Sequence, residues 1–338
     1  MSAAARALGS VEHVREPSAV PDAPPGVMSA GPLLVRDRAC LVAARAALRG
    51  RVAVVMTMGA LHEGHVSLVR LARQHADHVV VTVFVNPLQF GPGEDLDAYP
   101  RTLEADLAVC AVERVDVVLA PPVREVYPHG APSVRVSAGE LGDRWEGASR
   151  PGHFDGVLTV VVLLLHLLRP DVAVFGRKDR QQLHLLRRMV SDLAMGVDVV
   201  AGDTVREADG LARSSRNAHL DAPARAAAAA LPRALEQARA AAREGAAAPD
   251  VLAAAQDVLA VPGVAVDYCA LVDREHLREV AADHRGPAVL LLAARVGGTR
   301  LIDNTDLDLD LDPDLGPDLD PDLGPDATPE PPTAGARP

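Results

Sequence analysis

The segment VAVVMTMGALHEGHVSL, residues 52–68, joins an apolar run to a pair of histidines. The apolar run predicts a buried strand, and a helix fits from Gly64 to His75. His62 and His65 lie three residues apart with a glycine between them, whereas the zinc-binding HExxH pair lies four apart on one helix face. Glycine is a poor residue inside a helix but suits a turn that opens one.

The two histidines are therefore predicted to flank a helix N-terminus rather than to line a helix face. There, positive imidazoles and free backbone N–H groups would converge on a phosphate. For the isolated pair, ordinary surface or packed histidines are the simpler alternative. No metal ligand set is predicted, since a zinc site would want a third ligand.

Strand-like and helix-like segments alternate around this stretch. Continuous Val and Leu runs are typical of parallel strands that are buried on both faces. We therefore predict an α/β fold, a parallel sheet with helices on both faces. The predicted strands are 51–56, 78–85, 115–120, 171–176 and 197–202, and the predicted helices are 36–48, 64–75, 102–114, 154–168 and 180–193.

The composition of the sequence changes after Thr204, where an alanine-rich helical region is followed by further short strands. These strands are predicted at 264–273, 288–296 and 299–303. The expected parts are a flexible N-terminal extension (1–32), the sheet domain (33–203), a smaller C-terminal α+β domain (204–304) and a disordered acidic tail (305–338). Calcium binding by the tail is the less favoured alternative, because the glycine-rich nonapeptide spacing is absent.

Composition excludes several classes of protein. The formal net charge is −12, but Asp306 to Pro338 holds nine Asp and one Glu against one Arg. The remainder is nearly neutral, so nothing indicates nucleic-acid binding. The three cysteines form no CxxC pair, which argues against a zinc knuckle or a disulfide framework. The longest apolar run is too short to cross a bilayer and the N-terminus lacks a signal-peptide pattern, so we expect a soluble cytoplasmic protein.

Three further stretches carry polar groups where strands end or loops return. They are NPLQF (86–90), GRKDRQQ (176–182) and READGLARSSRN (206–217). In open parallel sheets, ligands bind beyond the C-terminal ends of the strands. Each stretch alone is more simply a polar turn or helix cap, but the four together favour an anion site. Gln181 and Gln182 can both read a hydroxylated carboxylate, and His153 either packs at a helix start or faces the cleft.

The ordered set TMGALHEGH, VFVNPLQF, GEDLDAYPRT, HFDGVLTVV, TVREADGL and SSRN resembles the pantothenate synthetase (pantoate–β-alanine ligase) family over residues 34–304. The resemblance implies a nucleotidyltransferase-type Rossmann-like fold. It also implies ATP-dependent condensation of (R)-pantoate with β-alanine through a pantoyl-adenylate, with release of AMP and pyrophosphate. Mg²⁺ would accompany ATP, and the family suggests a homodimer.

The resemblance also implies roles for individual residues. His65 would be the proton donor, His62 and Lys178 would contact phosphate, and Arg216 would close on the triphosphate. Gln89 and Gln182 would bind pantoate. The ATP-binding residues would be Met58, Gly59, Ala60, Leu61, His62, Glu63, Gly64, His65, Gly176, Arg177, Lys178, Asp179, Val205 (through its backbone), Arg213, Ser214, Ser215 and Arg216.

The sequence departs from the family pattern at three positions. Arg177, Arg180 and Arg213 stand where Glu, an aromatic residue and Met are usual, and each adds positive charge near the phosphates. Two other functions remain open. One is a related adenylyl- or cytidylyltransferase, although a phosphate substrate should meet more Arg or Lys than the paired glutamines offer. The other is a non-enzymatic ATP-binding scaffold whose acidic tail recruits a basic partner.

Overall fold

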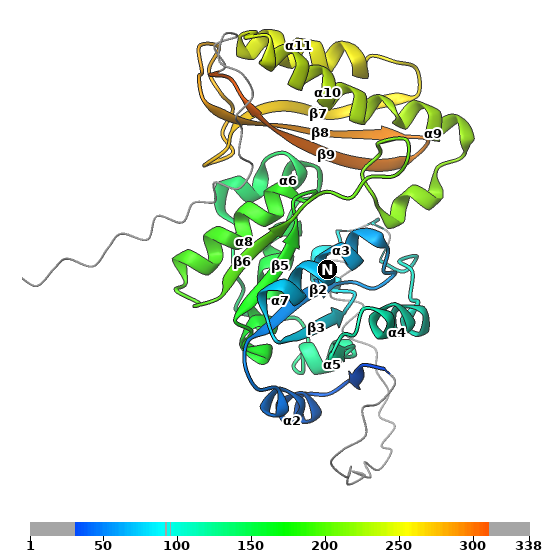
Figure 1. The fold of residues 1–338 in the computed structure, drawn as a ribbon, viewed down its shortest axis with the longest axis vertical. Helices are drawn as coiled ribbons and strands as arrows, with labels where there is room; N and C mark the ends of the chain where they lie inside the picture. The colour runs from blue at the N-terminus through cyan, green and yellow to red at the C-terminus, as the bar shows by residue number, and fades with distance from the viewer. Residues whose placement is uncertain (1–30, 92, 95, 311–338) are drawn as a thin grey trace, which may run out of the picture.

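A computed structural model describes residues 31–91, 93–94 and 96–310 of the chain. Its larger part is a six-stranded sheet in the order β1-β4-β3-β2-β5-β6, and every pairing is parallel (Figure 1). The strands are β1 (Leu33–Val35), β2 (Val52–Thr57), β3 (His78–Val83), β4 (Val117–Leu119), β5 (Val172–Gly176) and β6 (Asp198–Gly202). The longer helices between them are α2 (Arg38–Ala47), α3 (Glu63–His75), α4 (Leu103–Val112), α7 (His153–Leu168) and α8 (Arg180–Asp192). The α/β prediction is confirmed.

The two faces of this sheet are covered by different helices. Successive strand residues point to opposite faces. Val52 and Val54 therefore pack in one core with α2, α7 and α8, whereas Ala53 and Val55 pack in another with α3 and α4. All four side chains are fully buried. Burial on both faces explains why the strand has no polar alternation.

The strand order places the site. From β2 the chain crosses through α3 to β3 on one side, and from β5 it crosses through α8 to β6 on the other. β2 and β5 are paired neighbours, so the loops that leave their carboxyl ends diverge from one point of the sheet. Such a switch point leaves a crevice in which ligands bind.

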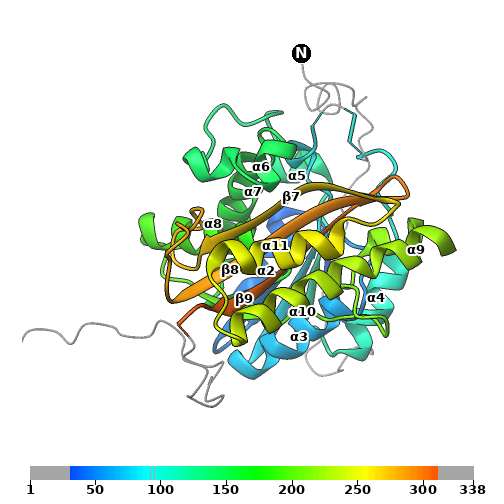
Figure 2. The ribbon, with the colours of Figure 1, turned by 90° about the horizontal axis from the view of Figure 1, so that it is seen from above.

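The C-terminal domain is a three-stranded antiparallel sheet in the order β7-β8-β9, and α10 (Ala230–Arg243) and α11 (Ala248–Leu259) lie over its outer face (Figure 2). Its inner face is turned toward the parallel sheet. The domain's alanine and leucine residues form a separate core. Its elements are α9 (Ala222–Ala228), α10 (Ala230–Arg243), α11 (Ala248–Leu259), β7 (Val264–Asp273), β8 (Pro287–Val296) and β9 (Thr299–Asp308).

Two details differ from the sequence prediction. The sequence predicts no strand at β1, because three residues are too few to show a period of hydrophobicity. β9 continues to Asp308, although its end was predicted at residue 303 and the acidic tail from 305. Leu307 and Leu309 are buried in the C-terminal core, so this Leu–Asp alternation is the two-residue period of a strand with one buried face. The extension up to residue 30 and the tail from 311 lie outside the described residues.

In the part of the chain that the structure describes, no helix is both long and apolar enough to cross a membrane.

The short helix η1 (Pro87–Gln89) packs directly on α7. Asn86 is buried, and its amide donates to the Gly156 carbonyl at 3.1 Å and accepts from the Tyr127 hydroxyl at 2.8 Å. A Cβ at Gly156 would lie 2.2 Å from the Leu88 carbonyl oxygen. Glycine at this position therefore lets the loop lie against the helix.

Gly156→Ala should destabilise the protein, because the backbone of residues 88–89 must move away from α7. Overpacking of this kind costs about 1–3 kcal/mol. A matched thermal unfolding series checks it, with Gly31→Ala as the control, since a Cβ there meets nothing nearer than 4.0 Å. Equal unfolding temperatures for the two variants would contradict the tight contact.

Candidate active site

The loop after β2 turns sharply before α3. Gly59 and Ala60 have positive φ angles of 86° and 52°, and the first suits glycine. The carboxylate of Asp106, on α4, is buried and accepts the N–H groups of Ala60 at 3.2 Å and Leu61 at 2.8 Å. This carboxylate holds the turn in the shape that delivers the chain to the start of α3.

His62 and His65 cap the N-terminus of α3, where the sequence placed them. Nδ1 of His62 accepts the Gly64 N–H at 3.2 Å, and Nδ1 of His65 accepts the His62 N–H at 3.3 Å. The two rings stack with centroids 4.1 Å apart. Because each Nδ1 is an acceptor, each neutral ring carries its proton on Nε2. Both side chains line one cavity, where their Nε2–H groups can donate hydrogen bonds to a ligand.

Both imidazoles are neutral at pH 7, and the expectation of positive rings was wrong. Burial lowers the pKa of His62 to about 4, and the charges of Lys178 and Arg213 act in the same direction. Burial likewise lowers the pKa of His65 to about 3, with His62 and Lys178 adding to the shift. A desolvated ring among cations gives up its proton. The site's positive charge therefore comes from other loops.

The loop between β5 and α8 meets this pair across the switch point. Lys178 and Asp179 line the same cavity as the histidines. Gln181 and Gln182, which come next in the chain, have different environments. Gln181 is buried, donates to the Leu141 and Arg144 carbonyls and accepts the Glu146 N–H, so its hydrogen bonds are used within the fold. Gln182 lines the cavity beside the histidines, which Gln181 does not reach, although both line the larger cleft between the domains.

The cavity beside the histidines has a volume of about 260 Å³. Gln89 is one of its amides, and its Nε2 donates to the Met58 sulfur at 3.1 Å while its Oε1 accepts from Asn86 at 3.2 Å. Apolar side chains of α7 and β5 line the same cavity. The result is a small chamber with an apolar wall and a few fixed polar groups, a form typical of small-molecule sites.

His153, for which the sequence leaves two interpretations open, is the first residue of α7 and also lines the cavity. Its Nδ1 donates to the Gln89 carbonyl at 2.8 Å, so its Nε2 accepts from Arg150 at 3.0 Å. Burial, with the charge of Arg150, lowers its pKa to about 4. Arg150 also makes a two-point ion pair with Glu94, at 2.6 and 3.1 Å. These contacts tie the loop after η1 to the start of α7.

The third loop approaches from the chain that links the two domains. Arg213, Ser214, Ser215 and Arg216 all line the cavity, as does Val205. The Ser214 hydroxyl accepts the Arg216 N–H at 3.3 Å and starts the short helix η3 (Ser215–His219). The Val205 carbonyl accepts the Arg213 N–H at 2.8 Å, so the segment is folded back on itself.

Each of the three arginines that depart from the family pattern has a carboxylate partner. Arg177 lies 3.2 Å from Asp203, and Arg213 lies 3.9 Å from Glu207. Arg180 makes a two-point pair with Asp306 at 2.7 and 3.1 Å. The charge of Arg180 is therefore closely paired, whereas the pairs of Arg177 and Arg213 are exposed and contribute little.

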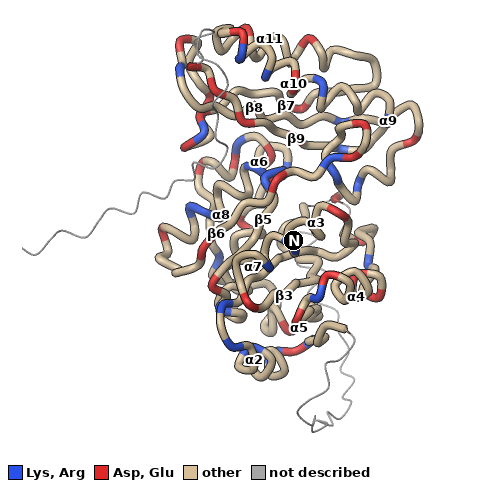
Figure 3. The backbone as a smooth tube through the Cα atoms, in the orientation of Figure 1, with Lys and Arg blue, Asp and Glu red and all other residues tan. Residues whose placement is uncertain are grey.

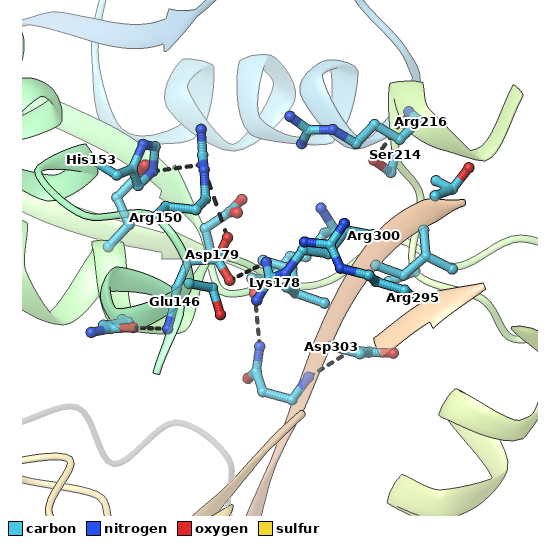
Figure 4. Close-up of a pocket in the computed structure, with 18 of the residues that line it drawn as sticks. Glu146, Arg150, His153, Lys178, Asp179, Ser214, Arg216, Arg295, Arg300 and Asp303 are labelled. Atoms are coloured by element: carbon cyan, nitrogen blue, oxygen red, sulfur yellow. Dashed lines mark hydrogen bonds and ion pairs between the residues drawn. The ribbon is translucent and has the colours of Figure 1, made fainter. Parts of the chain in front are cut away.

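A larger cleft of about 480 Å³ opens between the two domains (Figure 4). It shares residues with the smaller cavity, so the two are parts of one site; the shared residues are Arg150, His153, Lys178, Asp179, Gln182, Ser214 and Arg216. Arg295, Arg300 and Asp303 line it from the C-terminal domain. Basic and acidic residues both occur along the chain where the two domains meet (Figure 3).

The family profile described as pantoate-beta-alanine ligase matches residues 35–306. The chain belongs to this family. A pantothenate synthetase from Acidothermus cellulolyticus is 57% identical over 279 residues, which cover 82% of this chain and 92% of that protein. The structure of a pantothenate synthetase from Thermus thermophilus has a TM-score of 0.76 at 48% identity, covering 81% of this chain and 98% of that one.

A pantoate–β-alanine ligase from Francisella tularensis has been solved in complex with β,γ ATP and β-alanine. It is 30% identical to this chain with a TM-score of 0.68, and the match covers 81% of this chain and 97% of that one. Among the residues that the structure describes, no cluster of three or more His, Cys, Asp or Glu side chains is arranged to hold a metal ion.

Most of the candidate site residues line one cavity, but not all of them do. Some residues predicted to bind ATP do not line the shared cavity: Gly59, Ala60, Leu61, Glu63 and Arg177. Glu63 instead pairs with Arg70 at 2.9 Å on an exposed surface. Asp106 and Arg150 were missed, because a buried carboxylate and a buried arginine are recognised by partners that are distant in sequence. All roles assigned to this ligase's site residues remain predictions.

The tautomers of the two capping histidines can be observed directly. We expect His62 and His65 to stay neutral, with the proton on Nε2, from pH 8 to 5.5, because their pKa values are lowered to about 4 and about 3. Long-range ¹H–¹⁵N NMR of the imidazole nitrogens measures this, and His62→Gln assigns the signals. A titration near pH 6.5 in either ring would contradict the buried, capped geometry.

Proposed function

We propose that the chain condenses (R)-pantoate with β-alanine at the expense of ATP, through a pantoyl-adenylate, and releases AMP and pyrophosphate. One observation carries the proposal. A helix N-terminus with two neutral histidines, a loop with Lys178 and an amide-lined apolar chamber open into one cavity. That combination suits a triphosphate beside a small hydroxylated acid.

The first step joins pantoate to AMP. A carboxylate oxygen of pantoate attacks the α-phosphorus, the bond from that phosphorus to the bridging oxygen breaks, and pyrophosphate leaves with the electron pair. Lys178 and Arg216 offset the negative charge that develops on the phosphates, and the α3 N-terminus contributes its partial positive charge. The acid becomes reactive because AMP is a far better leaving group than oxide.

Pantoate would lie in the smaller chamber. Its carboxylate and hydroxyl groups need hydrogen-bond partners, which Gln89 and Gln182 supply as both donors and acceptors. Its two methyl groups need an apolar wall, and Val160 and Val161 of α7 line that side. The volume of about 260 Å³ limits the acid to a small one.

The histidines act as hydrogen-bond donors in this proposal. In the substrate-free protein burial lowers the pKa of His65 to about 3, so the ring is neutral and its Nε2–H is the donor that the proposed proton-donor role would use. Its Nε2–H can still stabilise a charged oxygen, and it costs no reorganisation when that charge forms. His62 would do the same for a neighbouring phosphate oxygen.

The second step forms the amide. The amine of β-alanine attacks the acyl carbon, the bond from that carbon to the AMP oxygen breaks, and the nitrogen loses a proton as AMP leaves. The acyl-adenylate is prone to hydrolysis, so the cleft must exclude water while it exists. A site enclosed between two domains meets that need, and the β-alanine complex of the Francisella tularensis protein supports this second substrate.

Mg²⁺ would enter as part of the MgATP substrate. In such sites the ion is held by phosphate oxygens with one or two carboxylates, and Asp179 is a carboxylate that lines both parts of the cleft. The homodimer and the cytoplasmic location suggested by the family remain predictions.

Two alternatives are distinguishable. A nucleotidyltransferase acting on a phosphate substrate would release pyrophosphate without β-alanine and would form no amide. A non-enzymatic scaffold would bind nucleotide without turnover. The glutamines of the chamber favour the ligase over the nucleotidyltransferase, because a phosphate substrate would be expected to meet cations in their place. Turnover separates the ligase from the scaffold.

The purified protein should form pantothenate and AMP in equal amounts from pantoate, β-alanine and MgATP. Omitting β-alanine should stop turnover after one adenylate per site. Coupled detection of AMP together with mass spectrometry of the product measures both. Absence of AMP with all three substrates present would refute the proposal.

His65→Ala should lower kcat by about 10²- to 10³-fold, the usual loss for one hydrogen-bond donor to a developing charge. His166→Ala is a matched control, since His166 is exposed and its Nδ1 bonds the Val162 carbonyl within α7. Steady-state kinetics with each substrate varied in turn measures the effect. An unchanged kcat for His65→Ala would remove this residue from the mechanism.

A further inference from the structure

The loop that carries Lys178 is held by a strand of the other domain. The side-chain amide of Asn304, on β9, donates to the carbonyls of Arg177 at 3.0 Å and Lys178 at 2.9 Å. Asn304 is buried, with 7% of its surface exposed. One side chain thus uses both of its N–H groups to fix two successive peptide units of the loop.

A second contact lies two residues further along β9. Asp306 makes a two-point pair with Arg180, whose side chain is only 11% exposed. Arg180 is the first residue of α8, where the helix dipole disfavours a positive charge. The Asp306 carboxylate offsets that charge. Asn304 and Asp306 are two apart, so they project from the same face of the strand toward the loop.

The strand is itself fixed at residue 303. Asp303 is almost fully buried and pairs with Arg206 at 2.6 and 3.1 Å, and it accepts the Asn304 N–H at 2.8 Å. Arg206 belongs to the segment that leads to the Ser214 loop. β9 therefore contacts two of the loops that line the cleft, and its position links them.

We propose that Asn304 and the Arg180–Asp306 pair are positioning residues, through which β9 sets the orientation of Lys178 toward the triphosphate. They touch no reacting atom and act through the backbone of residues 177–180. The inference rests on the proposed function in one respect only, namely that Lys178 contacts ATP. It makes the C-terminal domain a part of nucleotide binding rather than only a cover for the cleft.

A purely structural brace and a positioning role differ in what they change. Loss of a brace lowers the unfolding temperature and the amount of active protein, and it leaves the KM values of the folded enzyme alone. Loss of positioning changes the ATP parameters of the folded enzyme, since a misplacement of about 1 Å can cost 10²-fold in rate. Pantoate binding should change less than ATP binding, because Gln89 lies on a separate loop and only Gln182 follows the positioned residues.

The first experiment replaces Asn304. Asn304→Ala and Asn304→Asp both remove the two donors, and the second also places a carboxylate against two carbonyl oxygens. We expect kcat/KM for ATP to fall about 10- to 100-fold, with the larger loss for Asn304→Asp and with a smaller loss in kcat/KM for pantoate. Equal losses for ATP and pantoate, or no loss in either, would overturn the proposal.

The second experiment uses the sign of the effect of Asp306→Asn. This variant leaves Arg180 without its anionic partner and so increases the positive charge near the phosphates. Simple attraction would then lower KM for ATP, whereas a positioning role predicts that kcat/KM for ATP falls. Asp192→Asn is the matched control, because Asp192 makes an exposed pair with Arg188 on the same helix at 2.8 Å. A lower KM and a higher kcat/KM for ATP in Asp306→Asn would overturn the positioning role of the Arg180–Asp306 pair.

A third measurement is independent of turnover. Hydrogen–deuterium exchange of the substrate-free protein should be faster in Asn304→Ala for a peptide that spans residues 176–183, and unchanged for one that spans residues 59–66. If the wild-type protein forms no AMP, the proposed function fails while this measurement still tests the hold of β9 on the loop. Unchanged exchange at 176–183 would show that Asn304 does not fix it.

Discussion

The parallel pairing of β2 with β5 is the contact on which the site depends. It places two loops, one ending at the α3 N-terminus and the other at the α8 N-terminus, at a single point of the sheet. The chain leaves this point in opposite directions, so nothing in the sheet fills the space between the loops. The buried valines that make the strands rigid therefore also fix the distance between His65 and Lys178. The location of the cleft is therefore set by the strand order of the sheet rather than by any single side chain.

Burial then decides the charges of the groups that this pairing brings together. Desolvation keeps His62 and His65 neutral, and the Lys178 side chain lines the same cavity beside them. Two uncharged donors and a cation suit an anion whose charge shifts from carboxylate to phosphate during a reaction. Positive imidazoles would repel Lys178 and would be costly to bury. Neutral rings with a fixed tautomer avoid both costs, and the backbone N–H groups of the capping turn impose that tautomer.

Most of the fold was predictable from the sequence because its strands are continuous apolar runs and its helices start at recognisable turns. The placement of His62 and His65 at a helix start followed from their three-residue spacing and the glycine between them. Their charge did not, because a pKa depends on neighbours that only the tertiary structure supplies. The same limit separates Gln181 from Gln182: both are amides next to each other, and only packing against residues 141–146 shows which one the fold uses. Asp106 escaped prediction for the same reason, since its partners are the backbone amides of a distant turn.

The acidic C-terminal run shows how composition can hide structure. From residue 305 the sequence has the density of like charge that is typical of disorder, yet β9 extends to Asp308 and buries Leu307. Alternating Leu and Asp satisfies two demands at once: the leucines complete the C-terminal core, and the aspartates remain on the opposite face. That face contacts the loop at Arg180, and there Asp306 forms an ion pair with the Arg180 guanidinium. A charge that looks like part of a solvated tail thus connects the two domains beside the Lys178 loop, and only the pairing register of β9 reveals it.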